Sequence, residues 1–287
     1  MSTLKDFDQR VTFNGTVLES VRLTPEDYKD EVRHIVLELD RIGMKLEVGQ
    51  SIGVSVPGPH EFGNDEHFRL YSIAGFEPGH NGSSAAIALC VRRCFYIDEV
   101  NGERYPGVAS HFLCDRAVGE VVPLSGPYPS VFKLPEDVHS NIMMVGLGTG
   151  IAPFRAFVRH IYAKKHGWKG QVRLFYGAKT GLELLYMNDL KNDLGNYYDE
   201  TTFQAFEAVS PRPYLDEPIS LDHTLEQNAD EVWKLVQSPD TYVYLAGLEP
   251  VREMMDKAMS TIAGSEEKWR RRKKEMVAGE RWSELIY

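Results

Sequence analysis

Cysteine is scarce in this chain: there are three among 287 residues, and none form a C-x-x-C pair. Cys90 and Cys94 fall on a predicted strand, where four steps of about 3.3 Å put their α-carbons about 13 Å apart, too far for a disulfide. Three thiols are also fewer than the four ligands expected for an iron–sulfur cluster. We therefore expect any redox chemistry to come from a bound organic cofactor.

Long apolar runs are missing as well. No stretch approaches the roughly 18 apolar residues of a membrane span, and residues 1–10 lack the apolar segment of a signal peptide. We expect a cytoplasmic protein without a membrane span. The formal net charge of −10 argues against nucleic acid as a partner, because phosphate binding needs clustered lysine and arginine. The histidines include no H-x-x-x-H pair, so we assign no metal ligands.

The chain changes its apolar rhythm near the middle. Up to about Pro135, short apolar segments alternate with glycine, proline and asparagine, which predicts an antiparallel barrel or sandwich. Beyond Asn141 the order becomes strand, glycine turn and helix, which predicts a parallel sheet flanked by helices. The border between the two domains is predicted in residues 134–140, giving domains 1–137 and 138–287. The expected barrel strands are 32–39, 51–56, 70–74 and 86–93, and the expected helices of the second domain are 151–167, 182–195 and 249–264.

Each predicted strand of the second half ends in a glycine-bearing turn, at residues 146–150, Gly177 and Gly247. In an open parallel sheet, ligands bind outside the carboxyl ends of the strands, and glycine lets the backbone approach a phosphate. Pro153 falls near the first helical turn, whose free N–H groups can face an anion. A nucleotide is the natural ligand, although such turns are also plain connections in many α/β domains.

Four segments in a fixed order carry a resemblance to a known family. They are Arg-Leu-Tyr-Ser at 69–72, Cys-Val-Arg-Arg at 90–93, Gly-Thr-Gly-Ile-Ala-Pro-Phe-Arg at 148–155 and the final Tyr287. Together they resemble the plant-type ferredoxin–NADP(+) reductase family, and the likeness continues at 110–115, 125–127 and 184–186. The resemblance implies an antiparallel β-barrel that binds FAD, followed by a Rossmann-like α/β domain that binds NADP, with NAD as the alternative coenzyme.

The resemblance assigns a set of FAD-binding residues. It implies that Arg69 neutralises the pyrophosphate, Tyr71 stacks on the isoalloxazine and Ser72 hydrogen-bonds near flavin N5. Tyr96 would stack on the adenine, and Arg93 would contact the flavin nucleotide. The alternative is an ordinary barrel strand, with Tyr71 in the core. The remaining members of the set are Leu70, Cys90, Val91, Val108, Ala109 and Ser110, of which the last three would hold the FAD phosphate. The alternative for Ser110 is a helix N-cap, and both roles can hold at once.

A second set is implied for the nicotinamide coenzyme. Arg92 takes the place of a family lysine that reaches the NADP phosphates, and arginine keeps the charge and adds bidentate geometry, although the alternative is a solvated surface arginine. The family has an arginine after the position of Ser210, whereas this chain has a proline there and offers Arg212 and Tyr214 further on. We expect NADPH to be preferred to NADH, because Ser210, Arg92 and Arg212 supply a hydroxyl and charges for the 2′-phosphate. The rest of the set is Gly148, Thr149, Gly150, Ala178, Lys179, Gly247 and Leu248.

The catalytic candidates are Ser72, Glu284 and Tyr287. A terminal tyrosine in the family covers one flavin face, and nicotinamide must displace it, which makes Tyr287 a gate; the alternative is a frayed terminus. Two further positions depart from the family: Ala246 replaces a cysteine, and Leu285 replaces an acidic residue for which Glu284 is a candidate substitute. We expect slower or altered chemistry, because hydride transfer itself belongs to the cofactors.

The resemblance implies a reductase that takes hydride from NADPH and passes single electrons to an acidic carrier such as ferredoxin or flavodoxin, or to an oxygenase component. One alternative is a reductase subunit of a larger oxygenase or metabolic complex. Another is a flavin-binding interaction subunit without nicotinamide chemistry. The basic run at residues 268–274 is either a solvated helix face or a docking surface for an acidic carrier, since opposite charges accelerate association.

Overall fold

The structure is a computed structural model that describes residues 10–41, 43–58, 65–79, 85–164, 167–198, 200–209 and 220–287. The chain divides into two compact units, Met1–Ser130 and Val131–Tyr287. The border lies N-terminal to the predicted one at 137/138, because the segment after Ser130 packs into the second unit. Phe132 stacks on Phe154 with ring centroids 5.9 Å apart, and the Tyr244 hydroxyl donates a hydrogen bond to the carbonyl of Lys133.

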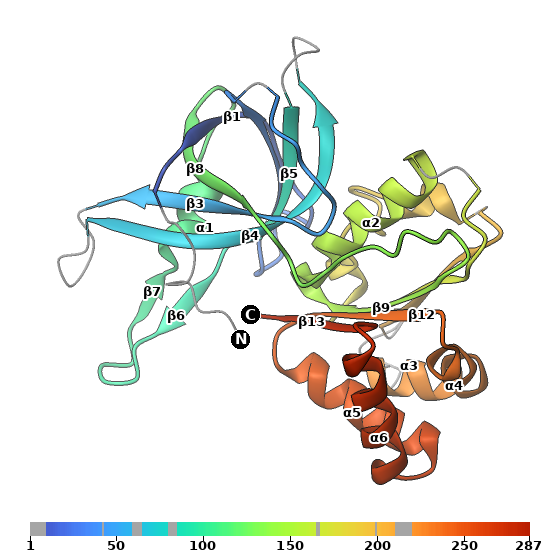
Figure 1. Cartoon of the computed structure of the whole chain (residues 1–287). Helices are drawn as coiled ribbons and strands as arrows, with labels where there is room; N and C mark the ends of the chain where they lie inside the picture. The colour runs from blue at the N-terminus through green and yellow to red at the C-terminus, as the bar shows by residue number, and fades with distance from the viewer. Residues whose placement is uncertain are drawn as a thin grey trace. The chain divides into compact units, whose positions relative to one another are not determined.

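The first unit is a closed barrel of six antiparallel strands (Figure 1). Its core consists of apolar side chains from all six strands together with Leu113. The predicted antiparallel barrel is therefore confirmed. In barrel order the strands are β1 (Phe13–Arg22), β2 (Val32–Leu39), β5 (Ala85–Arg92), β4 (Glu66–Pro78), β3 (Ser51–Pro57) and β8 (Val121–Tyr128).

Two smaller elements connect β5 to β8. The strands β6 (Phe95–Ile97) and β7 (Arg104–Pro106) pair into a short antiparallel ribbon. The helix α1 (Val108–Cys114) follows at once and buries Leu113 in the barrel core. The ribbon therefore lies between two segments of the predicted FAD set, Arg93 before it and the first turn of α1 with Ser110 after it.

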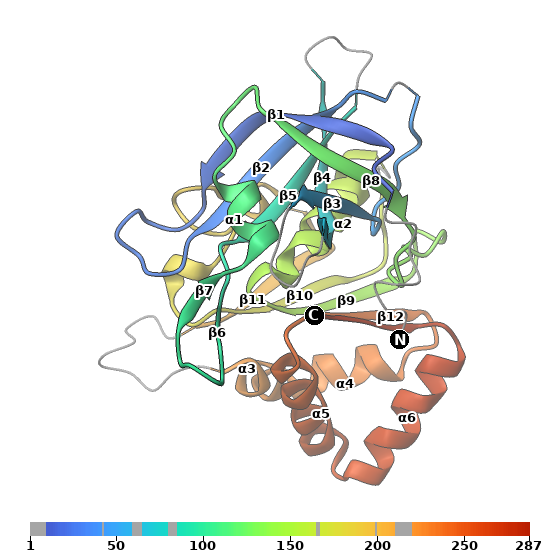
Figure 2. The ribbon, with the colours of Figure 1, turned by 90° about the vertical axis from the view of Figure 1, so that its left-hand side faces the viewer.

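The second unit is a five-stranded, fully parallel sheet. Helix α2 (Ile151–Lys164) covers one face, and the four later helices lie on the other (Figures 1 and 2). This confirms the predicted parallel sheet flanked by helices. The sheet order is β11 (Phe203–Ala208), β10 (Val172–Gly177), β9 (Asn141–Leu147), β12 (Thr241–Gly247) and β13 (Trp282–Ile286), and the later helices are α3 (Leu221–Gln227), α4 (Ala229–Gln237), α5 (Pro250–Ala263) and α6 (Glu266–Ala278).

The helix predicted over residues 182–195 is wrong. The structure has two short 3₁₀ helices there, η4 (Gly181–Glu183) and η5 (Leu194–Tyr197), joined by turns. Tyr186 has a φ of 63°, which an α-helix cannot accommodate. The four residues from Leu184 to Met187 are buried in succession, so the segment has no single apolar helical face.

The three cysteines form no disulfide in the structure, and Cys90 and Cys114 are buried while Cys94 is exposed. Among the helices of the described residues, none has both the length and the apolar composition needed to cross a bilayer.

We predict that Phe157→Ala destabilises the second unit by about 3–5 kcal/mol, because this fully buried ring contacts Tyr244 edge-on at 5.1 Å and its removal leaves a cavity. Denaturant unfolding followed by tryptophan fluorescence measures this unit selectively, since Trp168, Trp233, Trp269 and Trp282 all belong to it. The control Leu182→Ala, at a side chain that is 47% exposed, should change stability by less than about 0.5 kcal/mol. Equal effects of the two substitutions would contradict this account of the core.

Candidate functional site

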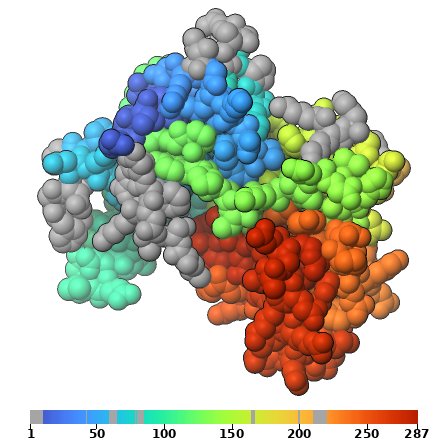
Figure 3. Space-filling model, in the orientation of Figure 1, coloured from blue at the N-terminus to red at the C-terminus, as the bar shows by residue number. Residues whose placement is uncertain are grey.

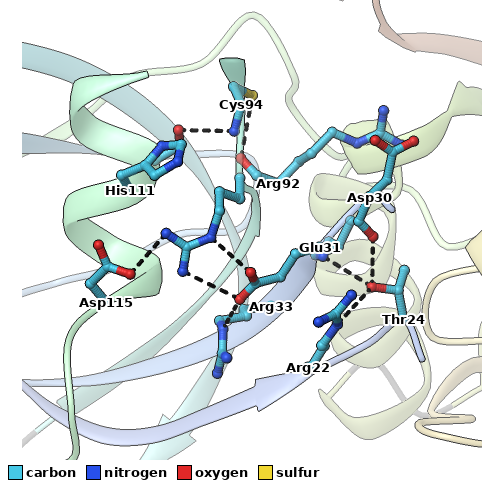
Figure 4. Close-up of polar contacts among 12 residues, drawn as sticks. Arg22, Thr24, Asp30, Glu31, Arg33, Arg92, Cys94, His111 and Asp115 are labelled. Atoms are coloured by element: carbon cyan, nitrogen blue, oxygen red, sulfur yellow. Dashed lines mark hydrogen bonds and ion pairs between the residues drawn. The ribbon is translucent and has the colours of Figure 1, made fainter. Parts of the chain in front are cut away.

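Arg93 joins three segments of the first unit. It follows β5, and its Nε lies 2.7 Å from Glu31 Oε2, just before β2. Its Nη1 lies 2.8 Å from Oδ1 of Asp115, the C-cap residue of α1 (Figure 4). Arg33 also donates to the Glu31 carboxylate. The predicted FAD-contacting arginine is therefore held in place by carboxylates from two other segments.

The charges of this cluster are mutually stabilised. Burial raises the pKa of Glu31, but hydrogen bonds from Arg93 and Arg33 outweigh it, so the pKa lies below the ordinary value. For Arg93, burial opposes the charge while Glu31 and Asp115 favour it more strongly, so its pKa rises. Sequence reasoning missed Glu31, because it lies 62 positions from Arg93 with no local pattern linking the two.

Arg92 is the last residue of β5, and Arg93 follows it directly. The backbone N–H of Arg93 donates to the Glu31 carbonyl at 2.9 Å, which extends the pairing of β2 with β5, and side chains alternate along such a strand. The two guanidinium groups therefore point away from each other. This geometry suits separate partners for them, as the resemblance implies.

Ser110 ties the start of α1 to the chain that follows β5. Its Oγ accepts a hydrogen bond from the backbone N–H of Cys94 at 3.1 Å and donates one to the Gly107 carbonyl at 3.1 Å. Gly107 is the N-cap of α1, so the alternative of Ser110 as N-cap is wrong. Val108, Ala109 and Ser110 form the first turn, whose early N–H groups have no acceptor within the helix.

The Arg-Leu-Tyr-Ser motif lies on β4. Tyr71 is the register partner of Ile52 and packs against the barrel core. Burial raises the pKa of Tyr71, so its ring is neutral at physiological pH. Leu70 and Ser72 point to the opposite face from Arg69 and Tyr71, because side chains alternate on a strand.

Besides Ala109 and Ser110, which are buried in α1, two residues of the FAD set on β5 have buried side chains. Val91 belongs to the barrel core, and Cys90 is 7% exposed. Any flavin contact of these two residues would therefore come from their backbone atoms. Tyr96, by contrast, is 46% exposed.

In the second unit, three predicted coenzyme segments meet at the carboxyl ends of neighbouring parallel strands. The turn Gly148–Gly150 follows β9, Gly247 ends β12, and Tyr287 follows β13. The Tyr287 hydroxyl lies 2.9 Å from Thr149 Oγ1, and its backbone N–H donates to the Gly247 carbonyl at 3.2 Å. The terminal residue is thus bound to both turns.

Gly150 is required by the close approach of this turn to β12. A β-carbon at position 150 would lie 2.3 Å from the Ala246 carbonyl oxygen, a backbone atom that cannot move aside. Gly247 has a φ of 144°, which favours glycine. The glycines therefore let two loops come together where a nucleotide would bind.

Ala246 and Leu285, two of the positions that depart from the family, are adjacent in the sheet. Ala246 on β12 and Leu285 on β13 are register partners, so they share one face of the sheet. Glu284 points to the opposite face. There its carboxylate accepts hydrogen bonds from Trp282 Nε1 at 2.7 Å and from Arg252 Nε at 2.8 Å. It also lies 3.1 Å from Lys273 Nζ. The structure therefore corrects the suggestion that Glu284 substitutes for an acidic residue at position 285, because a one-residue shift reverses the face.

The remaining predicted coenzyme residues are less constrained. Ala178 and Lys179 follow β10 at the same edge, and Lys179 is exposed, as is Leu248 at 56%. Ser210, Arg212 and Tyr214 lie outside the described residues. Within the described part of the chain, no group of three or more His, Cys, Asp and Glu residues is placed to hold a metal ion.

The basic run at 268–274 lies on α6, and part of its charge is used within the fold. Arg272 donates to the Val236 carbonyl at 2.8 Å, and Lys273 lies 2.9 Å from Asp256. Of its exposed residues, Arg270 pairs with Glu266 one turn away. The surface of α6 is therefore less positive than its sequence suggests.

Comparisons with known proteins give consistent results. Residues 144–259 match the family model described as oxidoreductase NAD-binding domain. The chain is 33% identical to the ferredoxin–NADP reductase of Spirulina sp. over 95% of this chain and 94% of that protein, and 33% identical to that of Synechocystis sp. over 97% and 68%. A solved ferredoxin–NADP(+) reductase from Plasmodium falciparum, with 19% identity, superposes with a TM-score of 0.67 over 96% of this chain and 95% of that one, which shows the same fold.

We predict that Glu284 stabilises the second unit in a pH-dependent way. Burial raises its pKa, but hydrogen bonds from Trp282 and Arg252 and the charge of Lys273 lower it below the ordinary value of 4.5. A carboxylate with a lowered pKa contributes stability above the unfolded-state value and loses it as the pH falls through the folded-state value. Glu284→Gln should therefore cost about 1–3 kcal/mol at pH 7 and progressively less below about pH 4.5.

Thermal unfolding of both proteins between pH 3 and 7 tests this prediction. The control is Glu253→Gln, an exposed carboxylate on α5 next to Arg252, which should cost less than about 0.5 kcal/mol throughout. A Glu284→Gln deficit that stays constant with pH would show that the charge network is not the source of the stability.

Proposed function

The chain belongs to the ferredoxin–NADP(+) reductase family, and from that premise we propose that it is an FAD-dependent oxidoreductase that transfers electrons from NADPH to a ferredoxin. The observation that carries this proposal is the likeness over nearly the whole length of both proteins, at 33% identity with the Spirulina reductase. The family's motifs are also present in order in both units.

The donor groups of the first unit support FAD as the bound flavin. A dinucleotide carries a pyrophosphate and two ring systems, which need fixed positive charge and aromatic planes. Arg93 supplies a guanidinium held by Glu31 and Asp115, and Tyr71 and Tyr96 supply rings at two separate points. When bound, FAD accepts two electrons as hydride and releases them one at a time.

The carboxyl edge of the second unit supports the nicotinamide coenzyme. Gly150 and Gly247 allow the turns after β9 and β12 to approach closely, which is the arrangement that open α/β sheets use for nucleotides. We propose NADPH as the preferred coenzyme, because the resemblance assigns the charges of Arg92 and Arg212 and the hydroxyl of Ser210 to its 2′-phosphate. The apolar side chains of Ala246 and Leu285 carry no proton donor, so these two residues would orient the coenzyme rather than move protons.

The acceptor is proposed to be a ferredoxin, the protein named in the relatives. A flavodoxin or an oxygenase component remains the alternative, and the exposed cations of α6 are one place for an acidic carrier to dock. The cytoplasmic location stays a prediction from the sequence.

We predict that NADPH-driven reduction of cytochrome c by this protein requires added ferredoxin, because the haem protein reports electrons that leave the flavin through a carrier. Ferricyanide, a small acceptor that needs no docking surface, should be reduced without ferredoxin. Reduction of ferricyanide alone would favour an oxygenase or other complex as the physiological acceptor. Reduction of neither acceptor would favour the flavin-binding subunit.

We further predict that Tyr287→Ser tightens NADPH binding about threefold to tenfold. In the gating role taken from the resemblance, the ring must leave the flavin before nicotinamide can stack, and an aromatic contact contributes about 0.5–1.5 kcal/mol. NADH should gain proportionally more in turnover, and NADPH turnover should fall if release becomes slow.

The matched control for this variant is Tyr287→Phe, which keeps the ring and removes only the hydroxyl that contacts Thr149. It should change coenzyme affinity less than Tyr287→Ser does. Unchanged affinity and an unchanged NADPH/NADH ratio in the serine variant would show that the gating role was wrongly assigned.

A further inference from the structure

The β6–β7 ribbon presents aromatic side chains that the barrel does not bury. Phe95 is 43% exposed and Tyr96 is 46% exposed, and the ribbon stands out at the surface beside the barrel (Figure 3, teal). A two-stranded ribbon alone is only marginally stable in water. The ribbon therefore needs contacts with the rest of the unit to be stable, and its exposed aromatic rings are a candidate binding surface.

The ribbon is anchored to α1 through one of its faces. The Phe95 ring meets His111 edge-on with centroids 4.7 Å apart, and the Arg104 guanidinium lies 3.6 Å from the Phe95 ring centroid. At the base, the Gly107 N–H donates to the Cys94 carbonyl at 2.9 Å. Because side chains alternate along strands, Tyr96 and Tyr105 lie on the other face.

Tyr96 and Tyr105 are direct register partners whose rings stack, with centroids 5.4 Å apart and planes inclined by 19°. Tyr105 is fixed at its far end as well: its hydroxyl donates to Glu103 at 2.6 Å and accepts from Asn101 Nδ2 at 3.0 Å. One face of Tyr96 is thus covered by a ring that is itself held in position. A flat ligand group would stack on the side of Tyr96 away from Tyr105.

We propose that Tyr105 is a positioning residue for the purine of FAD, which it aligns by backing Tyr96. This inference rests on the proposed function, because it takes FAD as the ligand. The ribbon begins two residues after Arg93, which is assigned to the flavin nucleotide, and ends just before the first turn of α1, which is assigned to the FAD phosphate. A base attached to a phosphate held there is the flat group within reach, and bases stack on aromatic rings whatever their identity.

The test compares FAD with FMN, which lacks the adenine half, by titrating flavin-free protein and following flavin fluorescence. Tyr105→Leu should weaken FAD about fivefold to tenfold and leave FMN unchanged, because one aromatic contact is lost. Tyr105→Phe, which keeps the ring, should stay within about twofold of the parent for both flavins. The double variant Tyr96→Leu/Tyr105→Leu should bind FAD no more weakly than Tyr96→Leu alone, because Tyr105 acts through Tyr96.

Three outcomes would overturn the inference. Equal losses for FAD and FMN would show that Tyr105 only stabilises the unit, and independent losses in the double variant would show that it contacts FAD itself. An FAD affinity that Tyr105→Leu leaves unchanged would show that the stacking has no role in binding. Failure of the proposed function gives a different result, since the parent protein would then bind neither flavin or would bind FAD no more tightly than FMN.

Discussion

The bridge that Arg93 makes between Glu31 and Asp115 is the interaction on which the organisation of the first unit depends. It joins the residue before β2, the residue after β5 and the C-cap of α1 in one charged cluster. Because Arg93 stays charged and the pKa of Glu31 is lowered, the cluster keeps its charges over the physiological pH range. The β6–β7 ribbon and the first turn of α1 lie within the chain between Arg93 and Asp115, so the ion pairs hold both ends of the segment that carries Tyr96 and Ser110.

In the second unit, the arrangement of the turns at the carboxyl edge of the sheet depends on a steric constraint and not on a pair of charges. Gly150 must lack a side chain for the turn after β9 to pass the Ala246 carbonyl, and the terminal Tyr287 then reaches both this turn and Gly247. The residues behind this edge are held separately: Glu284, Arg252 and Lys273 fix β13 to α5 and α6 from the opposite face. The anchoring carboxylate of Glu284 therefore lies on the face of β13 opposite to Leu285.

Local patterns predicted much of the fold. The strand expected at 32–39 is β2, residue for residue, because a short segment rich in β-branched residues such as Val32, Ile35 and Val36 favours a strand over a helix. The helix predicted over residues 182–195 is absent, because the apolar residues of this segment are buried by tertiary contacts around Tyr186 and do not form one helical face. The face of Glu284 was predictable in principle from the alternation of Trp282 and Ile286, whereas the partners Glu31 for Arg93 and Thr149 for Tyr287 were not, since each pair is distant in sequence.

The most direct test of the central claim is the visible spectrum of the purified protein before and after NADPH is added in the absence of oxygen. We predict a flavin absorption band that bleaches on addition of NADPH and returns when air is admitted, because the bound FAD accepts hydride from the coenzyme. A protein that binds no flavin, or a yellow protein whose spectrum neither NADPH nor NADH changes, would contradict the account.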